Sequence, residues 1–223
     1  MQEVALKGPV EIYCDFDGTI TDRDSFDFLL ETLALPEWQE IEEQWQKDEL
    51  TARECMRLQT ELIRGTFSEI ASALKKVSID PTFPPFARWC REVGVKLYVV
   101  SDGVDRIIEH VLEREGVQVD QVWSNRLVQN KTGNFALEFP NASDDCSLGI
   151  CKCALLEKAA GTVTRIVIGD GKSDFCWAKV ADVLFAKKQL IDYCRNQGLA
   201  HIEFENFQSI QKVLEERLAV TNA

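Results

Sequence analysis

The 223-residue sequence lacks the features that would place it on a nucleic acid or in a membrane. Its 25 basic side chains are outnumbered by 37 acidic ones, and a net charge of −12 would repel a polyanion, so we expect no nucleic-acid partner. No apolar run approaches the length of a membrane span, and the N-terminus has no stretch of signal-peptide length. We therefore expect a cytoplasmic protein without a membrane partner. Internal repeats and low-complexity segments are also missing from the sequence.

Histidine is scarce as well, since His110 and His201 are the only two and fall in unrelated segments. A structural zinc site normally needs four nitrogen or sulfur ligands. The eight cysteines are scattered, and only Cys146, Cys151 and Cys153 lie close together in the sequence. We expect these three to be reduced thiols in a loop, with a thiol–metal site or a disulfide as the alternative.

One stretch near the N-terminus stands out among otherwise ordinary segments. The apolar run Val10–Cys14 is followed at once by Asp15, Phe16, Asp17 and Gly18. A buried strand would present its last residues at the carboxyl edge of a sheet, where open α/β folds bind ligands. Two carboxylates so close together repel each other unless a cation lies between them. The stretch therefore predicts a functional site rather than a packed core.

Two further apolar segments end in polar, glycine-bearing loops. The predicted strand Val95–Val100 runs into residues 101–103, read Ser-Asp-Gly, and the predicted strand Arg165–Ile168 runs into a loop that carries Asp170 and Asp174. The carboxyl ends of parallel strands meet at one edge of a sheet. We therefore expect all three loops to gather at the same place.

About sixty residues between the first two of these loops show helical periodicity and no strand. Ser25 is placed to cap the first helix, and Thr51 and Glu54 have the spacing of a capping box. Four amphipathic helices in succession are typical of a small bundle. The predicted fold is α/β, with a Rossmann-like core of residues 1–21 and 81–223 around a mostly parallel sheet, and an inserted four-helix-bundle cap of residues 22–80.

The chemistry available at such an edge follows from its carboxylates. Several carboxylates in one place need a hard divalent cation, and oxygen ligands suit Mg²⁺, with Asp15 and Asp170 as the best side-chain ligands. Asp15 could then act as a nucleophile that forms an aspartyl-phosphate. Ser101, the amide of Gly103 and a lysine could hold the phosphoryl oxygens, since positioned positive charge does much of the work in phosphate-ester hydrolysis.

These motifs, in this order, resemble those of the haloacid dehalogenase superfamily of phosphatases. The resemblance covers nearly the whole chain: Asp15 to Thr19, then Ser101, then a lysine, then residues 169–174, with a helical cap after the first motif. It implies a Mg²⁺-dependent hydrolase acting on a small phosphorylated metabolite. The implied roles are nucleophile for Asp15; general acid and then base for Asp17; phosphate binding for Ser101, Asp102, Gly103 and Lys152; magnesium ligands for Asp15, Asp170 and, through its carbonyl, Asp17; and support of the lysine or of metal-bound water for Asp174.

Within the superfamily, the segments Ala34–Trp38 and Cys146–Lys152 are the closer guides. They resemble the phosphatases that act on 2-hydroxy-3-keto-5-methylthiopentenyl-1-phosphate in methionine salvage, then those acting on phosphoethanolamine or phosphocholine, and then phosphoserine phosphatases. The carboxyl group of Asp102 departs from the usual pattern, in which a second glycine is common. It would put another negative charge near the phosphate.

Several alternatives remain open from the sequence. Lys158 and Lys172 are rivals to Lys152, an alcohol could replace water to give a phosphotransferase, and the fold could serve as a binding module. Four arginines of the cap could meet an anionic substrate, although a solvated surface is the expectation for each: Arg23, Arg53, Arg57 and Arg64. No segment indicates an oligomeric state.

Overall fold

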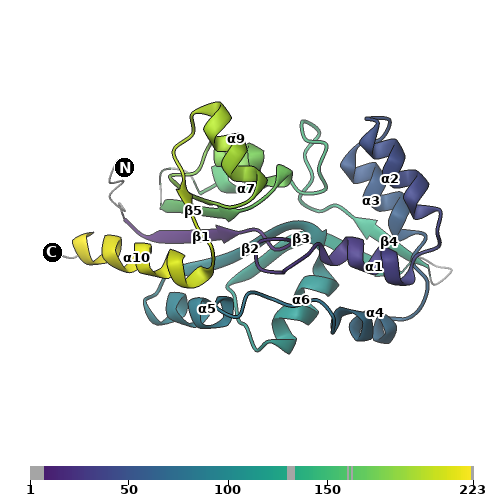
Figure 1. The fold of residues 1–223 in the computed structure, drawn as a ribbon, viewed down its shortest axis with the longest axis horizontal. Helices are drawn as coiled ribbons and strands as arrows, with labels where there is room; N and C mark the ends of the chain where they lie inside the picture. The colour runs from purple at the N-terminus through teal and green to yellow at the C-terminus, as the bar shows by residue number, and fades with distance from the viewer. Residues whose placement is uncertain (1–7, 130–133, 160, 162, 222–223) are drawn as a thin grey trace.

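A seven-stranded sheet runs through the centre of the computed structural model, which describes residues 8–129, 134–159, 161 and 163–221 (Figure 1). The strand order is β4-β3-β2-β1-β5-β6-β7; each neighbouring pair is parallel except β3 with β4, which is antiparallel. The strands are β1 (Val10–Cys14), β2 (Lys96–Val104), β3 (Gln121–Gln129), β4 (Phe135–Glu138), β5 (Thr164–Gly169), β6 (Val183–Ala186) and β7 (Ile202–Glu203).

Helices cover both faces of this sheet. One face carries α5 (Phe83–Glu92), α6 (Asp105–Arg114) and α10 (Phe207–Thr221), while the other carries α7 (Lys152–Glu157), α8 (Phe175–Ala178) and α9 (Gln189–Gln197) (Figure 1). The short 3-10 helix η1 (Lys172–Asp174) precedes α8. This arrangement confirms the predicted α/β fold with a mostly parallel sheet.

Alternation along the central strand explains the two layers. Ile12 and Cys14 of β1 belong to the core under α5, α6 and α10, whereas Tyr13 belongs to the core under α7, α8 and α9. Side chains of successive strand residues point to opposite faces, so a strand that is buried on both sides reads as a continuous apolar run. β1 is the middle strand of the sheet, and its last residue delivers Asp15 to the carboxyl edge.

The segment of residues 22–80, here called the cap segment, contains the four predicted helices. They are α1 (Ser25–Leu33), α2 (Trp38–Gln46), α3 (Ala52–Thr60) and α4 (Phe67–Leu74). α1 lies beside α4 and α2 beside α3 (Figure 1), and α3 also contacts β4.

The packing of these helices does not confirm a four-helix bundle with a core of its own. Phe26 and Leu30 of α1 and Leu74 of α4 share one cluster with Ile107 of α6 and Leu127 of β3. The division of the chain into a core and a cap domain stays a prediction.

Local details correct some of the sequence-based expectations. Asp24, not Ser25, caps α1, by accepting hydrogen bonds from two backbone amides. The Thr51–Glu54 capping box is present as predicted. β2 extends to Val104 instead of ending at Val100, with a register shift between the two. The sequence of residues 127–140 predicts a β-hairpin. Its strands β3 and β4 pair, and residues 130–133 of the connection lie outside the described residues.

Within the described part of the chain, the helices are all too short or too polar to cross a lipid bilayer.

Candidate active site

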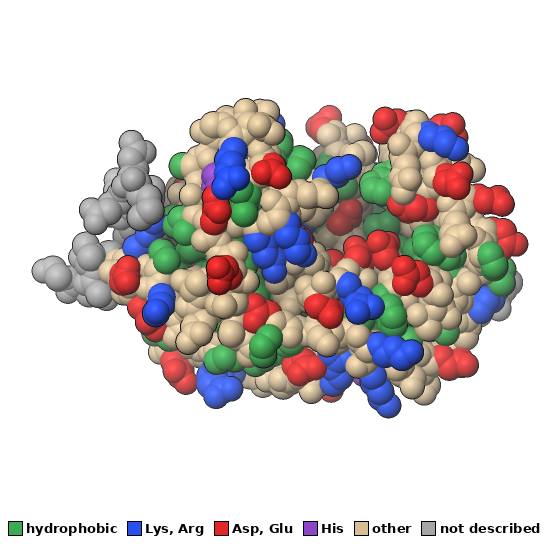
Figure 2. All heavy atoms as spheres, viewed as in Figure 1, with side chains coloured by type: hydrophobic (Ala, Val, Ile, Leu, Met, Phe, Trp, Pro, Cys, Tyr) green, Lys and Arg blue, Asp and Glu red, His purple; other side chains and the backbone are tan. Residues whose placement is uncertain are grey.

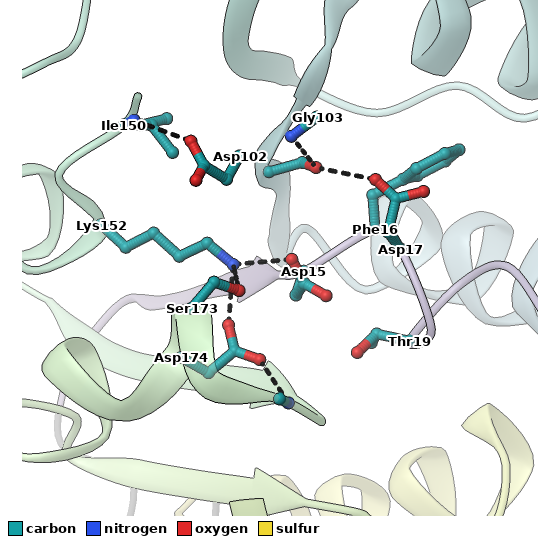
Figure 3. Close-up of polar contacts among 12 residues, drawn as sticks. Asp15, Phe16, Asp17, Thr19, Asp102, Gly103, Ile150, Lys152, Ser173 and Asp174 are labelled. Carbon is teal, nitrogen blue, oxygen red and sulfur yellow. Dashed lines mark hydrogen bonds and ion pairs between the residues drawn. The ribbon is translucent and has the colours of Figure 1, made fainter. Parts of the chain in front are cut away.

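The loops after β1 and β5 and the last residues of β2, among them Ser101 and Gly103, meet at the carboxyl edge of the sheet (Figure 3). Gly18 shapes the first loop, because its φ of +76° is one that residues with a Cβ rarely adopt. A Cβ at Gly18 would also collide with the carboxylate of Asp170. A glycine therefore lets the loop after β1 lie directly against the loop after β5.

Lys152 is the centre of the most enclosed part of the site. Its side chain is 0% exposed, and its Nζ lies 2.6 Å from Asp15 Oδ1 and 2.7 Å from Asp174 Oδ1. The ammonium also donates to Ser173 Oγ at 3.2 Å and lies 4.7 Å from the centre of the Trp177 ring. The structure thus brings Lys152 into contact with Asp15, while its rivals Lys158 and Lys172 are exposed.

Burial and charge act against each other in this cluster. Burial raises the pKa of Asp15, the Lys152 ammonium opposes that shift, and repulsion from Asp174 and Asp170 adds to it, so that the pKa of Asp15 is raised to about 7. For Lys152, burial favours the neutral amine, but the two carboxylates prevail and raise its pKa above the ordinary value. The lysine is therefore charged, and it stabilises the ionised form of Asp15.

Asp174 connects Lys152 to the loop after β5. Its second oxygen, Oδ2, accepts hydrogen bonds from the amides of Asp170 at 2.9 Å and Gly171 at 3.1 Å. Asp174 thereby orients the lysine with one oxygen and holds the β5 loop with the other. This contact corresponds to the first of the two supporting roles that the motif implies.

Asp15, Asp170 and Asp174 are the carboxylates that fit a divalent cation. Each offers one oxygen, and these three atoms lie within 4.8 Å of one another. Asp170 also accepts from Thr19 Oγ1 at 3.2 Å and pairs with Lys188 Nζ at 2.9 Å. An all-oxygen, anionic donor set of this kind suits Mg²⁺.

Asp17 has a different set of partners. Its Oδ1 accepts from the amide of Ser25 at 2.8 Å and from the Ser25 hydroxyl at 2.6 Å, and its Oδ2 accepts from Ser101 Oγ at 3.4 Å. Burial and the charge of Asp24 raise the pKa of Asp17 well above its ordinary value, against the Ser25 hydrogen bonds, which lower it. The Asp17 carboxylate is not part of the three-carboxylate group, so a metal contact from this residue is left to its carbonyl, as the motif implies.

The C-terminal part of β2 supplies hydroxyl and amide groups next to Asp17. Ser101 is 1% exposed, and its Oγ accepts a hydrogen bond from the amide of Gly103 at 2.9 Å. A Cβ at Gly103 would lie 2.6 Å from Asp17 Oδ2 and 3.0 Å from Ser101 Oγ. The glycine therefore keeps open the space between these two side chains.

Asp102 does not face the other carboxylates. Its Oδ1 accepts from the amide of Ile150 at 3.1 Å and from Asn125 Nδ2 at 3.2 Å, and Figure 3 shows its side chain turned toward Ile150. Burial raises its pKa, which Asn125 partly offsets. The extra negative charge that the sequence predicts near the site is therefore bound by the Ile150 amide and Asn125 Nδ2.

Sequence reasoning missed several residues of this site, in particular Ser25, Thr19, Ser173, Asn125 and Lys188. Ser25 has a signal that fits two roles, because a serine at a helix start can cap the helix or bind a neighbouring side chain. For the others, only the three-dimensional contacts give the assignment.

The predicted thiol group is also in the structure. All eight cysteines are free, and Cys151 Sγ lies 3.5 Å from Cys153 Sγ. Among the described residues, the carboxylate group is the one set of three or more potential ligands close enough to share a metal. A preformed thiol–metal site is therefore not found there.

Comparisons with known proteins show the family and the fold of this chain. Residues 12–179 match the family described as haloacid dehalogenase-like hydrolase. The 2-hydroxy-3-keto-5-methylthiopentenyl-1-phosphate phosphatase of Brevibacillus brevis is 29% identical over 212 residues, covering 92% of this chain and 95% of the relative. That of Bacillus cereus is 31% identical over 222 residues, covering 95% and 98%. Pdp3-interacting factor 1 of Schizosaccharomyces pombe is 30% identical over 224 residues, covering 95% and 97%.

Solved structures show the same fold at lower identity. A phospho-aspartyl intermediate analogue of phosphoserine phosphatase is 22% identical, with a TM-score of 0.66 over 93% of this chain and 99% of that one. A substrate-bound phosphoserine phosphatase is 21% identical, with a TM-score of 0.68 over the same shares of the two chains.

Proposed function

The chain belongs to the haloacid dehalogenase-like hydrolases and is a phosphatase of that family, and from this premise we propose that it hydrolyses a small phosphorylated metabolite through an aspartyl-phosphate on Asp15. The observation that carries this proposal is the contrast in partners between Asp15, which is paired with the buried ammonium of Lys152, and Asp17, which is held by hydroxyl and amide donors. The Lys152 ammonium favours the ionised form of Asp15, which attacks, and Asp17 can hold a proton.

In the first step, the free oxygen of Asp15 attacks the phosphorus, and the bond between phosphorus and the ester oxygen breaks. Asp17 donates its proton to the departing oxygen, which leaves as an alcohol. In the second step, Asp17 takes a proton from water, whose oxygen attacks the phosphorus and displaces Asp15. The products are inorganic phosphate and the original carboxylate.

The phosphoryl group would be held by the Ser101 hydroxyl, the Gly103 amide and the Lys152 ammonium. Ser101 and Gly103 already contact each other next to Asp17, and Lys152 contacts Asp15. The Gly103 amide now donates to Ser101 Oγ, and Ser101 and Lys152 donate to Asp17 and Asp15. These donors are therefore close to the reacting groups and would be redirected to the phosphoryl oxygens when substrate binds, where they stabilise developing charge.

Mg²⁺ is the cofactor that this donor set fits, with Asp15, Asp170 and the Asp17 carbonyl as its proposed ligands. When bound, the ion offsets the repulsion between the carboxylates and the phosphate and withdraws charge from the phosphoryl oxygens. Asp174 would hold the Lys152 ammonium in place next to the metal site. We expect Mg²⁺ to raise the melting temperature of the wild type, and to do so much less in Asp170→Asn, because a ligand that binds only the folded state stabilises it.

The experiment that tests the mechanism uses an aryl phosphate such as p-nitrophenyl phosphate, with Mg²⁺ or EDTA. Wild type should turn it over only with Mg²⁺, and Asp15→Asn should lose at least about 10⁴-fold in rate. Acid-quenched Asp17→Asn should carry a phosphoryl group on the peptide that contains Asp15, detected by mass spectrometry. Full activity of Asp15→Asn would overturn the nucleophile assignment.

For the substrate, the names of the most similar relatives favour the methionine-salvage enol phosphate. A second class, in which the phosphate ester also carries an ammonium group, is supported by the acidic surroundings of Asp17. Burial, with repulsion from Asp24 and Glu42, raises the pKa of Asp27 to about 7, and the pKa of Asp24 is raised as well. Figure 2 shows acidic side chains gathered in the hollow between the lobe of α7 and α9 and that of α2 and α3.

A substrate panel separates these two classes and the transfer reaction. It should contain the salvage intermediate, phosphoethanolamine, phosphocholine and phosphoserine, each at matched concentration. Adding an acceptor alcohol and measuring its phosphorylated product tests whether the enzyme is a phosphotransferase. The cytoplasmic location and a substrate-selecting role for residues 22–80 belong to the same proposal, and fluorescence localisation and exchange of cap residues test them.

A further inference from the structure

We propose that Arg53 of the cap segment is a positioning residue that fastens the loop of residues 143–148 to α3 and thereby holds Lys152 in place. The expected effect on turnover rests on the function proposed above, whereas the effect on the loop does not. The sequence placed Arg53 on a solvated surface or against an anionic substrate. Its contacts support neither of these positions.

The Arg53 guanidinium is bound to the backbone of one loop. Nη2 donates to the carbonyls of Ser143 at 2.8 Å, Cys146 at 2.5 Å and Leu148 at 3.1 Å, and Nε donates to Leu148 at 3.2 Å. The Arg53 amide also donates to the Ser147 carbonyl at 3.1 Å. One cap residue therefore binds four carbonyls within six consecutive residues.

The loop leads directly into the active site. Just after Leu148, the Ile150 amide donates to the Asp102 carboxylate at 3.1 Å, and the Cys151 amide donates to the Asn141 carbonyl at 2.9 Å. Lys152 follows with its side chain fully buried. The same loop therefore contacts the cap segment through Arg53 and contacts β2 through Asp102.

Asn125 lies in close contact with α3, with β2 and with this loop. Its Nδ2 donates to the Asp102 carbonyl at 2.5 Å, and a Cβ at Gly149 would lie 2.5 Å from its Oδ1. Asn125 Nδ2 is also 3.9 Å from Met56 Sδ of α3, the helix that carries Arg53. α3, the loop and β2 therefore meet at one point, and a displacement of the loop would be felt at Ile150 and Lys152.

The chemistry of arginine suits this role. Backbone carbonyls in an irregular loop need donors, and a guanidinium offers five in a rigid plane, whereas a lysine offers a single point charge. Displacing a catalytic group by about 1 Å can cost about 10²-fold in rate. Since Lys152 fits between Asp15 and Asp174 without spare room, loosening its loop should lower kcat more than it raises KM.

The test compares Arg53→Ala and Arg53→Lys with Arg57→Ala. Arg57 lies about one turn further along α3 and is exposed, with an ion pair to exposed Glu61. Wild type and variants are assayed for kcat and KM, for hydrogen exchange at residues 149–151, and for alkylation of Cys146 and Cys151 by iodoacetamide. We expect Arg53→Ala to lose roughly 10- to 100-fold in kcat with KM changed less than about threefold. Loop exchange and thiol alkylation should rise, and added guanidinium should restore part of kcat.

The controls keep the outcomes distinct. Arg57→Ala should match wild type in every measurement, and Arg53→Lys should lie between wild type and Arg53→Ala. If the loop of Arg53→Ala stays protected, or if it opens while kcat is unchanged, the proposal is overturned. If Asp15→Asn proves fully active, the proposed function fails, but the exchange and alkylation results still decide whether Arg53 fastens the loop.

Discussion

Asp15 and Asp17 are two residues apart on one loop, yet they sit in opposite electrostatic settings. Asp15 is 4% exposed and paired with an ammonium that a second carboxylate also holds. Asp17 is half-buried and accepts from the neutral Ser25 amide and hydroxyl, and burial, with repulsion from Asp24, raises its pKa. We therefore expect two roles for one residue type: a cation favours the ionised form of Asp15 as a nucleophile, and burial together with repulsion favours the protonated form of Asp17 as an acid.

After the loss of the nucleophile itself in Asp15→Asn, the largest effect should come from removing the acid side of the pair. Asp17→Asn keeps the hydrogen bonds of the side chain in part but cannot transfer a proton, so kcat should fall about 10²- to 10⁴-fold. The loss should be smaller for an aryl phosphate than for an alkyl phosphate, because a phenolate leaves without protonation. Steady-state kinetics on both substrates measure this. The exposed neighbour variant Asp22→Asn should behave like wild type, and equal losses on the two substrates would contradict the acid role.

The surroundings of Asp15 are disrupted most directly by removing the Lys152 ammonium. Lys152→Met removes the charge shared by Asp15 and Asp174, so kcat should fall about 10²- to 10³-fold. The unpaired carboxylates should also lower the free energy of unfolding by about 3–5 kcal/mol in EDTA, measured by urea denaturation. Lys158→Met, at the exposed end of α7, is the matched control. A Lys152→Met protein as stable as wild type in EDTA would show that this ion pair does not organise the site.

A smaller change should raise the pKa of Asp17 without removing its carboxyl group. Ser25 donates to Asp17 and lowers its pKa, so Ser25→Ala should raise that pKa further. Asp17 would then keep its proton to higher pH, and the alkaline limb of the kcat profile should move upward. We expect kcat at neutral pH to change by roughly three- to tenfold. An alkaline limb that moves downward would mean that another group controls it.

The smallest expected effect concerns Asp27 of α1 and is an effect on stability alone. The folded-state pKa of Asp27 is about 7, against about 3.9 in an unfolded chain. Between these values the folded state binds more protons, so this residue lowers stability as pH rises from about 4 to about 7. The Asp27 side chain is exposed, so solvent screening leaves only a small part of the free energy that this shift represents. Asp27→Asn should therefore raise the melting temperature by only about one to two degrees above pH 7, with no gain near pH 4. Glu40→Gln, exposed on α2, should show no such pH dependence.

The sequence predicted the catalytic edge well because its signals are local. A strand that is buried on both faces must end at the carboxyl edge, and the polar residues just after β1, β2 and β5 must follow it there. Glycine at position 18 is likewise explained by one backbone angle and one close contact.

The partners of side chains could not be predicted in the same way. An amphipathic stripe shows that a helix face is buried but not what covers it, so the four cap helices were grouped with one another rather than with α6 and β3. Arg53 and Asp102 have ordinary sequence surroundings, and their roles depend on a loop about fifty to ninety residues away. These contacts have no local signal in the chain.

The core that the cap segment shares with α6, β3 and β4 has a consequence for how this enzyme can be re-engineered. Excising residues 22–80 would uncover Val104, Ile107, Leu127 and Leu137, which are now at most 7% exposed. The shortened protein would expose a contiguous apolar surface and would tend to aggregate. A cap taken from a relative would therefore have to be transferred together with that relative's equivalents of the β3–β4 hairpin and of the α6 face that packs against the cap.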